Sequence, residues 1–238
     1  MMYVFITGTG KGLGKALAEV LLEEKQNTVH GISRHQSIQH TQYIHTTLDL
    51  SREERVKDFR FEQVQADKIV LVNNAGSLGD VQPLGRLDGQ SIVDTFMINS
   101  IAPALLINSF INTYRDVPAM KIIINVSSGA AQTPYDGWSE YCSSKAALEM
   151  LTHVGSQEQE LQKLPYPFVF LSIAPGVVDT DMQAQTRSLN NENFSRHQKF
   201  KDLKEKGELL DPYDVAREYV RIINDPSIVK GVTHRVSL

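Results

Sequence analysis

The sequence predicts one α/β domain over residues 1–238, with a doubly wound parallel sheet of about seven strands and helices on both faces. Short apolar runs alternate with longer amphipathic runs along the whole chain, which is the pattern of repeated strand–helix–strand units. No linker rich in proline, glycine or serine and no internal repeat divides the chain. A glycine-rich turn directly follows the first apolar run.

Five apolar runs are predicted as buried strands because they are rich in Val, Ile and Phe and are bounded by Gly, Pro or Asn. They cover Tyr3–Thr7, Thr28–Ser33, Lys68–Val72, Lys121–Val126 and Phe168–Ile173. Helical patterns lie between them, the clearest over Leu13–Glu24, Ser91–Tyr114 and Ser139–Gln162. A polar stretch from about Thr180 to Leu210 breaks this rhythm, and segments inserted at the carboxyl end of such a sheet often cover the ligand crevice. A surface excursion without ligand contact is the alternative.

Composition and charge exclude several classes of protein. A hydrophobic share of 41% and a charged share of 22% are ordinary for a soluble domain. The net charge of −4 argues against a general binder of nucleic acid or of anionic membranes. Cys142 is the single cysteine, so no internal disulfide forms. Because no targeting segment, no apolar run of about 18 residues and no metal-ligand spacing of histidines is present, we expect a cytoplasmic protein without a metal.

The first strand runs directly into a glycine loop, Thr7–Gly14, with the sequence TGTGKGLG, and a helix follows. Glycines allow a tight turn and let backbone N–H groups approach a pyrophosphate. The helix N-terminus adds free N–H groups and the positive end of its dipole. Since this loop lies at the first strand-to-helix junction, where the motif is required, the sequence predicts a Rossmann-type domain that binds a dinucleotide.

The end of the second strand indicates which dinucleotide. A site for NAD has an acidic residue there, which accepts a hydrogen bond from the ribose 2′-hydroxyl. This chain has Ser33 and Arg34 instead, and a guanidinium can bind a 2′-phosphate with two parallel hydrogen bonds. Lys11 in the glycine loop offers a second cation. Either cation alone would be interpreted as a solvated surface charge, but the two together favour NADP(H).

Tyr141 and Lys145 lie four residues apart in a helical pattern and therefore share a helix face. A phenol with an ordinary pKa of about 10 is a poor base at neutral pH, and a neighbouring ammonium lowers that pKa by favouring the phenolate. The preceding strand ends in Asn125–Gly129, with the sequence NVSSG, where a hydroxyl could bind the same carbonyl oxygen. The pattern indicates proton exchange with a substrate oxygen.

Five motifs in order resemble the short-chain dehydrogenase/reductase family, essentially from end to end. After the glycine loop come Asn73–Gly76 (NNAG), Asn99 in a helix, the Ser–Tyr–Lys set, and Pro175–Thr180 (PGVVDT). The catalytic serine of that family lies thirteen residues before the tyrosine, which selects Ser128 rather than Ser127. The resemblance implies that this chain is an NADP(H)-dependent oxidoreductase acting on a carbonyl or alcohol.

The resemblance also implies a role for each catalytic residue. Tyr141 would protonate the developing alkoxide, and Ser128 would orient the carbonyl. Lys145 would lower the pKa of Tyr141 and bind the nicotinamide ribose, while Asn99 would hold a water that links Lys145 to solvent. The hydride itself comes from the cofactor, and the protein supplies orientation and electrostatics.

For the cofactor, the family pattern places Asp49 at the adenine and Thr180, with the Val178 backbone, at the nicotinamide carboxamide. The implied contacts are Gly8, Lys11, Gly12, Leu13, Gly14, Ser33, Arg34, Asp49, Asn74, Ala75, Gly76, Tyr141, Lys145, Pro175, Gly176, Val178 and Thr180.

Within the family the chain is most similar to the sepiapterin reductases and the bacterial benzil reductases, in Tyr135–Trp138 (YDGW) and Pro175–Gln183 (PGVVDTDMQ). Sepiapterin reductases anchor the pterin through an aspartate in the last strand, where this chain has Arg235, which disfavours a pterin substrate. Trp138 could stack on a flat or aryl carbonyl compound, or could fill the core beneath the site. With Met182 as a further pocket residue, a diketone or an aryl ketone is the expected substrate.

Two other functions stay open. The same machinery serves 3-oxoacyl thioester or steroid oxidoreduction, because pocket shape depends on the variable segment. A non-catalytic NADP(H)-binding sensor is the third possibility. The long helical stretches over residues 91–114 and 139–162 are more apolar than one sheet contact needs, and in the resembling family these helices form a dimer interface. A homodimer is therefore expected, with a small carbonyl compound as ligand and no nucleic-acid or membrane partner.

Overall fold

A computed structural model describes residues 1–189 and 193–237. Its centre is a seven-stranded, wholly parallel sheet in the order β3-β2-β1-β4-β5-β6-β7. The strands are β1 (Met2–Thr7), β2 (Thr28–Ser33), β3 (Tyr43–Thr47), β4 (Lys68–Asn73), β5 (Met120–Val126), β6 (Phe168–Ala174) and β7 (Thr233–Arg235). The five predicted strands are confirmed with shifts of at most one residue at their ends. The two additional strands, β3 and β7, form the edges of the sheet.

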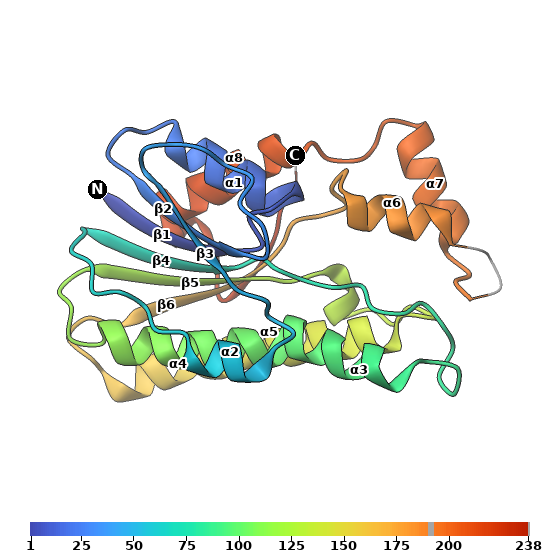
Figure 1. Cartoon of the computed structure of the whole chain (residues 1–238), viewed down its shortest axis with the longest axis horizontal. Helices are drawn as coiled ribbons and strands as arrows, with labels where there is room; N and C mark the ends of the chain where they lie inside the picture. The colour runs from blue at the N-terminus through green and yellow to red at the C-terminus, as the bar shows by residue number, and fades with distance from the viewer. Residues whose placement is uncertain (190–192, 238) are drawn as a thin grey trace.

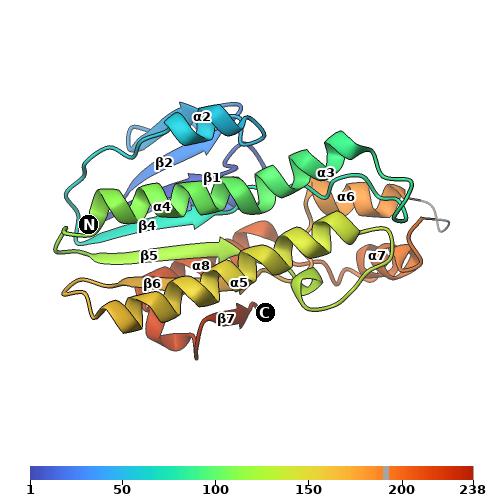
Figure 2. The same ribbon diagram turned by 90° about the horizontal axis from the view of Figure 1, so that it is seen from below.

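Helices cover both faces of the sheet, as predicted for a doubly wound domain (Figure 1). One face carries α1 (Gly12–Leu22) and α8 (Pro212–Asn224). The other carries α2 (Glu53–Asp58), α4 (Ala102–Tyr114) and α5 (Ser139–Gln162), with α4 and α5 running across the same side of the sheet (Figure 2). Ahead of α4, α3 (Gly89–Phe96) continues through a π-helical turn, η1 (Met97–Ile101). Two short 3-10 turns, η2 (Gly129–Ala131) and η3 (Pro226–Ile228), follow β5 and α8 respectively.

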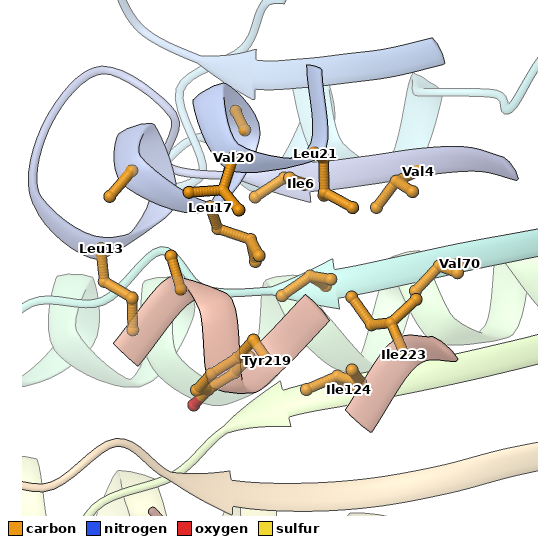
Figure 3. Packing of buried hydrophobic residues seen from close by; sticks show 14 of the residues in the cluster. Val4, Ile6, Leu13, Leu17, Val20, Leu21, Val70, Ile124, Tyr219 and Ile223 are labelled. Carbon is orange, nitrogen blue, oxygen red and sulfur yellow. The ribbon is translucent and has the colours of Figure 1, made fainter. Parts of the chain in front are cut away.

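The core on the α1 side forms because apolar residues recur at helical spacing in α1 and α8. Leu17 and Leu21 of α1 and Tyr219 and Ile223 of α8 face Val4, Ile6, Val70 and Ile124 of the sheet (Figure 3). All of these side chains are buried. Full burial of a side chain of this size contributes about 1.5–3 kcal/mol, so this layer holds the glycine loop and α1 firmly on the sheet.

No apolar run long enough to cross a membrane was expected from the sequence, but the helical stretch Gly89–Tyr114 meets a criterion based on length and composition. It is 26 residues long and contains an 18-residue window with a mean hydropathy of 1.3, so by length and composition it could cross a membrane. A helix in the core of a globular domain meets the same criterion, and 39% of this window is buried. Leu106, Phe110 and Tyr114 of this stretch are buried, since they pack in the core between α4 and the sheet.

The connections place the switch point of the strand order, where open parallel sheets form their ligand crevice, at the carboxyl ends of β1 and β4. From β1 the chain winds outward through β2 to β3, and from β4 it winds the other way through β5 and β6 to β7. Ligands of open parallel sheets bind at such a switch point. The loops after β1, β4, β5 and β6 all end at this edge.

The segment around residues 180–210 forms two short helices, α6 (Asp181–Ser188) and α7 (His197–Glu205), where the sequence indicated an irregular insertion. Both lie beyond the carboxyl ends of the strands (Figure 1). Residues 190–192 of this segment are outside the described residues. Phe200 of α7 and Phe194, which precedes α7, bury their rings in a third apolar cluster, together with Leu78, Val81 and Trp138. We call α6, α7 and their connection the cap segment.

Candidate active site

Tyr141 and Lys145 both lie in the first two turns of α5 and point to the same side, as their spacing predicts. Each side chain is buried. The Lys145 ammonium lies 5.9 Å from the centroid of the Tyr141 ring. Its Nζ donates a hydrogen bond of 2.8 Å to the carbonyl oxygen of Val126 at the end of β5. The strand end therefore sets where the ammonium stands relative to the phenol.

The two neighbouring serines after β5 point in different directions. Ser128 has an extended backbone, and its hydroxyl hydrogen-bonds the Tyr141 side chain and accepts from the Ala130 N–H at 3.2 Å. Ser127 donates instead to Glu149 Oε2 at 2.9 Å. Consecutive residues in extended chain project to opposite sides, so only one serine can reach the tyrosine. The structure brings Ser128, the serine chosen by spacing, against Tyr141.

Burial affects the two titrating side chains of α5 in opposite directions. It raises the pKa of the Tyr141 phenol, and the hydrogen bond from Ser128 offsets this only in part. It lowers the pKa of the Lys145 ammonium to about 8. A low-dielectric site disfavours the charged form of both groups, so the net pKa of the phenol lies above its ordinary value, and the lowering contributed by Lys145 stays a prediction. At neutral pH the phenol is protonated and can act as an acid.

Asn99 lies in the π-helical turn and is fully buried. Its Oδ1 accepts from the Ser77 N–H at 2.8 Å, and its Nδ2 donates to Ser77 O at 2.8 Å and to Ser144 Oγ at 2.9 Å. One amide hydrogen thus holds the loop after β4 and the other binds α5, a positioning role that the sequence did not indicate. One lone pair of Oδ1 remains. Asn99 Oδ1 and Lys145 Nζ flank Gly76, at 3.5 and 3.6 Å from where its Cβ would be.

The glycine loop has the geometry of a phosphate cradle. Gly8 and Gly12 have φ of +77° and +57°, values that side chains rarely adopt. Lys11 is the N-cap of α1 and forms no side-chain capping bond, so the first N–H groups of the helix are not used by that side chain. A Cβ at Gly14 would overlap Asn74 Nδ2. These features fit the pyrophosphate of a dinucleotide at the start of α1, next to Leu13.

The NNAG segment after β4 is bound to the glycine loop. The backbone N–H groups of Asn74 and Ala75 each donate to Thr7 Oγ1 at 3.0 Å. The Asn74 side chain donates to Thr7 O at 2.9 Å. The two predicted cofactor segments therefore line adjacent sides of the crevice at the switch point, which places Gly76 next to Lys145.

Of the residues expected to bind the adenosine part of the cofactor, some lie close together and others do not. Ser33 is buried at the end of β2, and Arg34 is exposed beside it. Although burial alone would raise the pKa of Asp49, hydrogen bonds from Ser51 and the charges of Arg34 and Arg52 hold that pKa below its usual range. Lys11 does not join Arg34, since its ammonium pairs with Asp181 of α6 at 2.8 Å.

The ion pair between Lys11 and Asp181 links the glycine loop to the cap segment across 170 residues of sequence. Both side chains are 73% exposed. Exposed pairs of this kind contribute about 0–1 kcal/mol, so a bound phosphate can take over the ammonium at little cost. Because Asp181 lies so far from Lys11 in the sequence, no local pattern identifies the two residues as partners.

The PGVVDT segment lies against the glycine loop. Gly176 has a φ of +82° and lies against Leu210, whose backbone pairs with Val178 in an isolated bridge. The methyl group of Thr180 lies 3.3 Å from where a Cβ of Gly12 would be. Pro175 joins this segment to the end of β6. The predicted carboxamide-binding residues are thus next to the phosphate cradle.

Trp138 is 6% exposed in the third apolar cluster. Its ring lies 5.1 Å from Tyr135 and 4.7 Å from Phe194, both stacked, and 5.5 Å from the edge-on Tyr141. Of the two interpretations left open by the sequence, this arrangement favours the core tryptophan, because its stacking partners come from the protein. The cluster nevertheless forms an apolar wall beside the phenol of Tyr141.

The other two substrate candidates lie in different surroundings. The Met182 methyl is 4.0 Å from the Cβ position of Gly76, so this side chain of α6 reaches the same space as Lys145. Arg235 is exposed at the carboxyl end of β7, where it pairs with Ala174 in the sheet register. Met182 thus borders the catalytic residues, and Arg235 stands at the rim of the sheet.

Two carboxylates next to the catalytic residues were not singled out from the sequence. Glu149 accepts hydrogen bonds from Ser127 and from Gln132 Nε2, the latter at 2.7 Å, and so joins α5 to the loop that carries Ser128. Its place one turn beyond Lys145 on the same face is a signal that helical spacing contains. Glu140 is buried and accepts from Ser91 Oγ at 3.0 Å and from the Asp80 N–H. No local pattern marks it.

Comparisons with known proteins agree on one family. The model of the short chain dehydrogenase family matches residues 2–191. A benzil reductase ((S)-benzoin forming) from Bacillus cereus is 36% identical, and the match covers 99% of each chain. Sepiapterin reductase from Xenopus tropicalis is 32% identical over 70% of this chain and 62% of its own length. The crystal structure of the KRED1-Pglu enzyme matches with a TM-score of 0.79 and 27% identity, covering 98% of this chain and 100% of that one.

The fold, the order of the motifs and these matches agree with one another. The sheet order and the glycine loop at the first strand-to-helix junction are those of a Rossmann-type domain. The chain therefore belongs to the short-chain dehydrogenase family, in which it is similar to the benzil reductases and the sepiapterin reductases.

Proposed function

We propose that this oxidoreductase uses NADPH to reduce a carbonyl compound to an alcohol, with diketones and aryl or other flat ketones as its substrates. One observation carries the proposal: a buried, protonated Tyr141 hydrogen-bonds Ser128 and lies beside the Lys145 ammonium. A phenol that is protonated at neutral pH can give its proton to an alkoxide, because the alkoxide is the stronger base. The benzil reductases, which match along the whole chain, support the direction and the substrate class.

The chain's own residues supply the proton and the electrostatics of this reaction. When bound, NADPH supplies the hydride that the carbonyl carbon receives. Ser128 donates a hydrogen bond to the carbonyl oxygen and orients it. Tyr141 transfers its phenolic proton to that oxygen, which yields the neutral alcohol. Lys145, as an ammonium, stabilises the phenolate that remains until solvent reprotonates it, and it holds the ribose hydroxyls.

The site also supports the choice of NADP(H) over NAD(H). Ser33 stands at the end of β2, where a carboxylate would repel a 2′-phosphate, and the Arg34 guanidinium is exposed next to it. The exposed Lys11 can leave Asp181 for a phosphate. For the substrate, the third apolar cluster offers flat aromatic surface beside Tyr141.

We further propose that the enzyme works in the cytoplasm as a homodimer. Apolar side chains of α5 and of the turn before α4 stand exposed, among them Ile101, Met150 and Val154. Covering such a surface with a second copy of the chain removes apolar area from water. The single cysteine, Cys142, fits a reducing compartment.

A substrate screen with matched serine variants tests the proposed function. NADPH absorbance is followed with benzil, sepiapterin, an acetoacetyl thioester and a steroid ketone, and we expect benzil to give the largest kcat/KM. Tyr141→Phe is expected to lower kcat by about 10²–10⁴-fold while NADPH binding, measured by fluorescence, stays unchanged. Ser128→Ala should also lower kcat. Ser127→Ala is its control, because that hydroxyl points to Glu149.

Three results would contradict the proposal. The enzyme could bind NADPH and oxidise it with none of these carbonyls, as a sensor would. Tyr141→Phe could keep most of its kcat. Preference for the thioester or the steroid over benzil would retain the chemistry and replace the substrate class.

A further inference from the structure

A chain of hydrogen bonds runs beneath the carboxyl end of β2. Tyr43 OH and Thr9 Oγ1 are 2.8 Å apart, and Thr9 Oγ1 donates to Ser33 Oγ at 3.3 Å. Ser33 Oγ donates to the carbonyl oxygen of His35 at 2.9 Å. His45 Nε2 lies 3.1 Å from the same Ser33 oxygen. The side chains of Thr9 and His45 thus meet at the serine that replaces the acidic residue of NAD sites, and Tyr43 is linked to it through Thr9.

The strand register builds this arrangement. Gly31 of β2 pairs with His45 of β3, and Ser33 pairs with Thr47, so Tyr43, His45 and Ser33 project from the same face. A Cβ at Gly31 would overlap the Tyr43 hydroxyl. Only a glycine at that position lets Tyr43 cross β2 to the glycine loop. The edge strand is therefore fastened to the cofactor crevice through side chains.

The charge of His45 controls where the Ser33 hydroxyl can point. A neutral imidazole can accept a hydrogen bond at Nε2, and then Ser33 can spend its single proton on His45. An imidazolium only donates at Nε2, so the Ser33 proton must go to another acceptor. His35 O accepts it in this structure. A phosphate oxygen bound beside Ser33 and Arg34 is a stronger acceptor of the same proton.

We infer that His45 is a positioning residue for the 2′-phosphate of NADP(H), whose imidazolium turns the Ser33 hydroxyl toward the phosphate and makes affinity for the phosphorylated cofactor depend on pH. The inference rests on the proposed use of NADP(H). His45 acts through Ser33 and adds a positive charge behind it, while Arg34 binds the phosphate directly. Its test is a binding measurement that needs no turnover.

The groups around His45 set the sign of the pH dependence. Burial lowers the pKa of His45, and a hydrogen bond with the Ser33 backbone raises it in part. The Tyr43 ring stacks on His45 with 6.3 Å between ring centroids, and burial lowers the pKa of the neighbouring His30 on β2 as well. Arg34 and Asp49 stand near each other beyond the two strand ends. His45 is thus neutral above its lowered pKa, and an arriving dianion favours the protonated form.

Isothermal titration calorimetry with adenosine 2′,5′-bisphosphate tests the inference, and 5′-AMP, which lacks the 2′-phosphate, is the matched ligand. Wild-type affinity for the bisphosphate should rise severalfold from about pH 8 to about pH 6, the range in which histidine titrates, with proton uptake seen as a buffer-dependent heat. Affinity for 5′-AMP should stay constant. The ionisation of the phosphate itself works in the opposite direction, because it loses charge near pH 6.

His45→Gln keeps a donor toward Ser33 but cannot titrate, so it should lose both the rise and the proton uptake while binding 5′-AMP normally. His40→Gln, an exposed histidine just before β3, is the control and should behave as wild type. Wild-type binding of the bisphosphate without proton uptake, or an unchanged pH dependence in His45→Gln, would overturn the inference even though NADP(H) is preferred. Equal affinities of wild type for the two ligands would instead overturn the choice of NADP(H).

Discussion

At the scale of single residues, the environment of α5 sets the resting protonation states of Tyr141 and Lys145. Burial keeps Tyr141 protonated and brings the pKa of Lys145 to about 8. The functional pair at neutral pH is therefore a neutral phenol and an ammonium. This combination favours reduction, in which the phenol gives up its proton while the adjacent cation stabilises the phenolate that forms.

The lowered pKa of Lys145 predicts how kcat/KM for ketone reduction depends on pH. The cation is present below a pH of about 8 and is lost above it, so kcat/KM for ketone reduction should fall as pH rises through that value. Lys145→Arg keeps a charge that is always present, and its remaining activity should show no such decline. Initial rates across the pH range measure both. An identical alkaline decline in the Arg variant would show that another group causes it.

Gly76 provides a second prediction, because a methyl there enters the space between Asn99 Oδ1, Lys145 Nζ and Met182. The distances of 3.5–4.0 Å are ordinary contacts, so Gly76→Ala should fold with a Tm close to wild type. It should nevertheless reduce kcat by about tenfold or more, as expected when a general-acid site is perturbed. Gly129→Ala, which adds a methyl into open space one residue after Ser128, is the control. Unchanged kcat in Gly76→Ala would exclude a role for this space.

At the scale of elements, the cap segment is fastened to the turn that precedes α5. Ser195 donates its N–H and its hydroxyl to Asp136 at 2.7 and 2.8 Å. The Arg196 guanidinium lies 4.3 Å from the centroid of the Tyr135 ring, and Phe194 stacks on Trp138. The cap therefore rests on the same short turn that starts the catalytic helix. A displacement of the cap segment should therefore shift the turn before α5, and the reverse should also hold.

Gly137 tests this contact between the cap and the turn. It has a φ of +74°, and a Cβ there would overlap the backbone oxygen of Asn193. Gly137→Ala should raise KM for the ketone severalfold by pushing the cap away, with a backbone strain of about 1–2 kcal/mol. Gly207→Ala has similar strain at a φ of +69° but meets open space. If both variants raise KM equally, strain rather than cap displacement is the cause.

The element scale also shows how far sequence periodicity reaches. Five strands and the helical stretches that contain α1, α3 with α4, and α5 were predicted because apolar residues recur there with a clear period. The edge strand β3 was not, because three of the five residues in its YIHTT sequence are polar and only one of its side chains is buried. β7 has three residues, too few for any period. Both strands exist because a neighbouring strand offers hydrogen bonds.

At the scale of the whole molecule, the exposed apolar side chains of α5 favour association of two chains. Met150 and Val154 lie four residues apart and are 63% and 43% exposed, on the same helix that carries Tyr141. A dimer formed there would tie the geometry of the active site to assembly. Buried apolar area contributes about 25 cal/mol per Å², so charging this surface should be costly for the dimer.

The double variant Met150→Glu, Val154→Glu is therefore expected to sediment as a monomer at concentrations where wild type is a dimer. Leu84→Glu, at an exposed leucine away from α5, should leave the sedimentation coefficient unchanged. Analytical ultracentrifugation measures both. A wild-type monomer, or a dimer that survives the double substitution, would contradict the proposed interface.

The sequence alone determined the doubly wound fold, the glycine loop at the first strand-to-helix junction and the Tyr141–Lys145 face, because each depends on spacing within one strand, turn or helix. Only the tertiary structure decided what surrounds them. Lys11 pairs with Asp181 rather than standing beside Arg34, and Trp138 stacks on Phe194 from the cap. The raised pKa of Tyr141 likewise comes from burial by several elements. Dielectric environment and distant pairing arise when separate segments pack together, and no local pattern contains them.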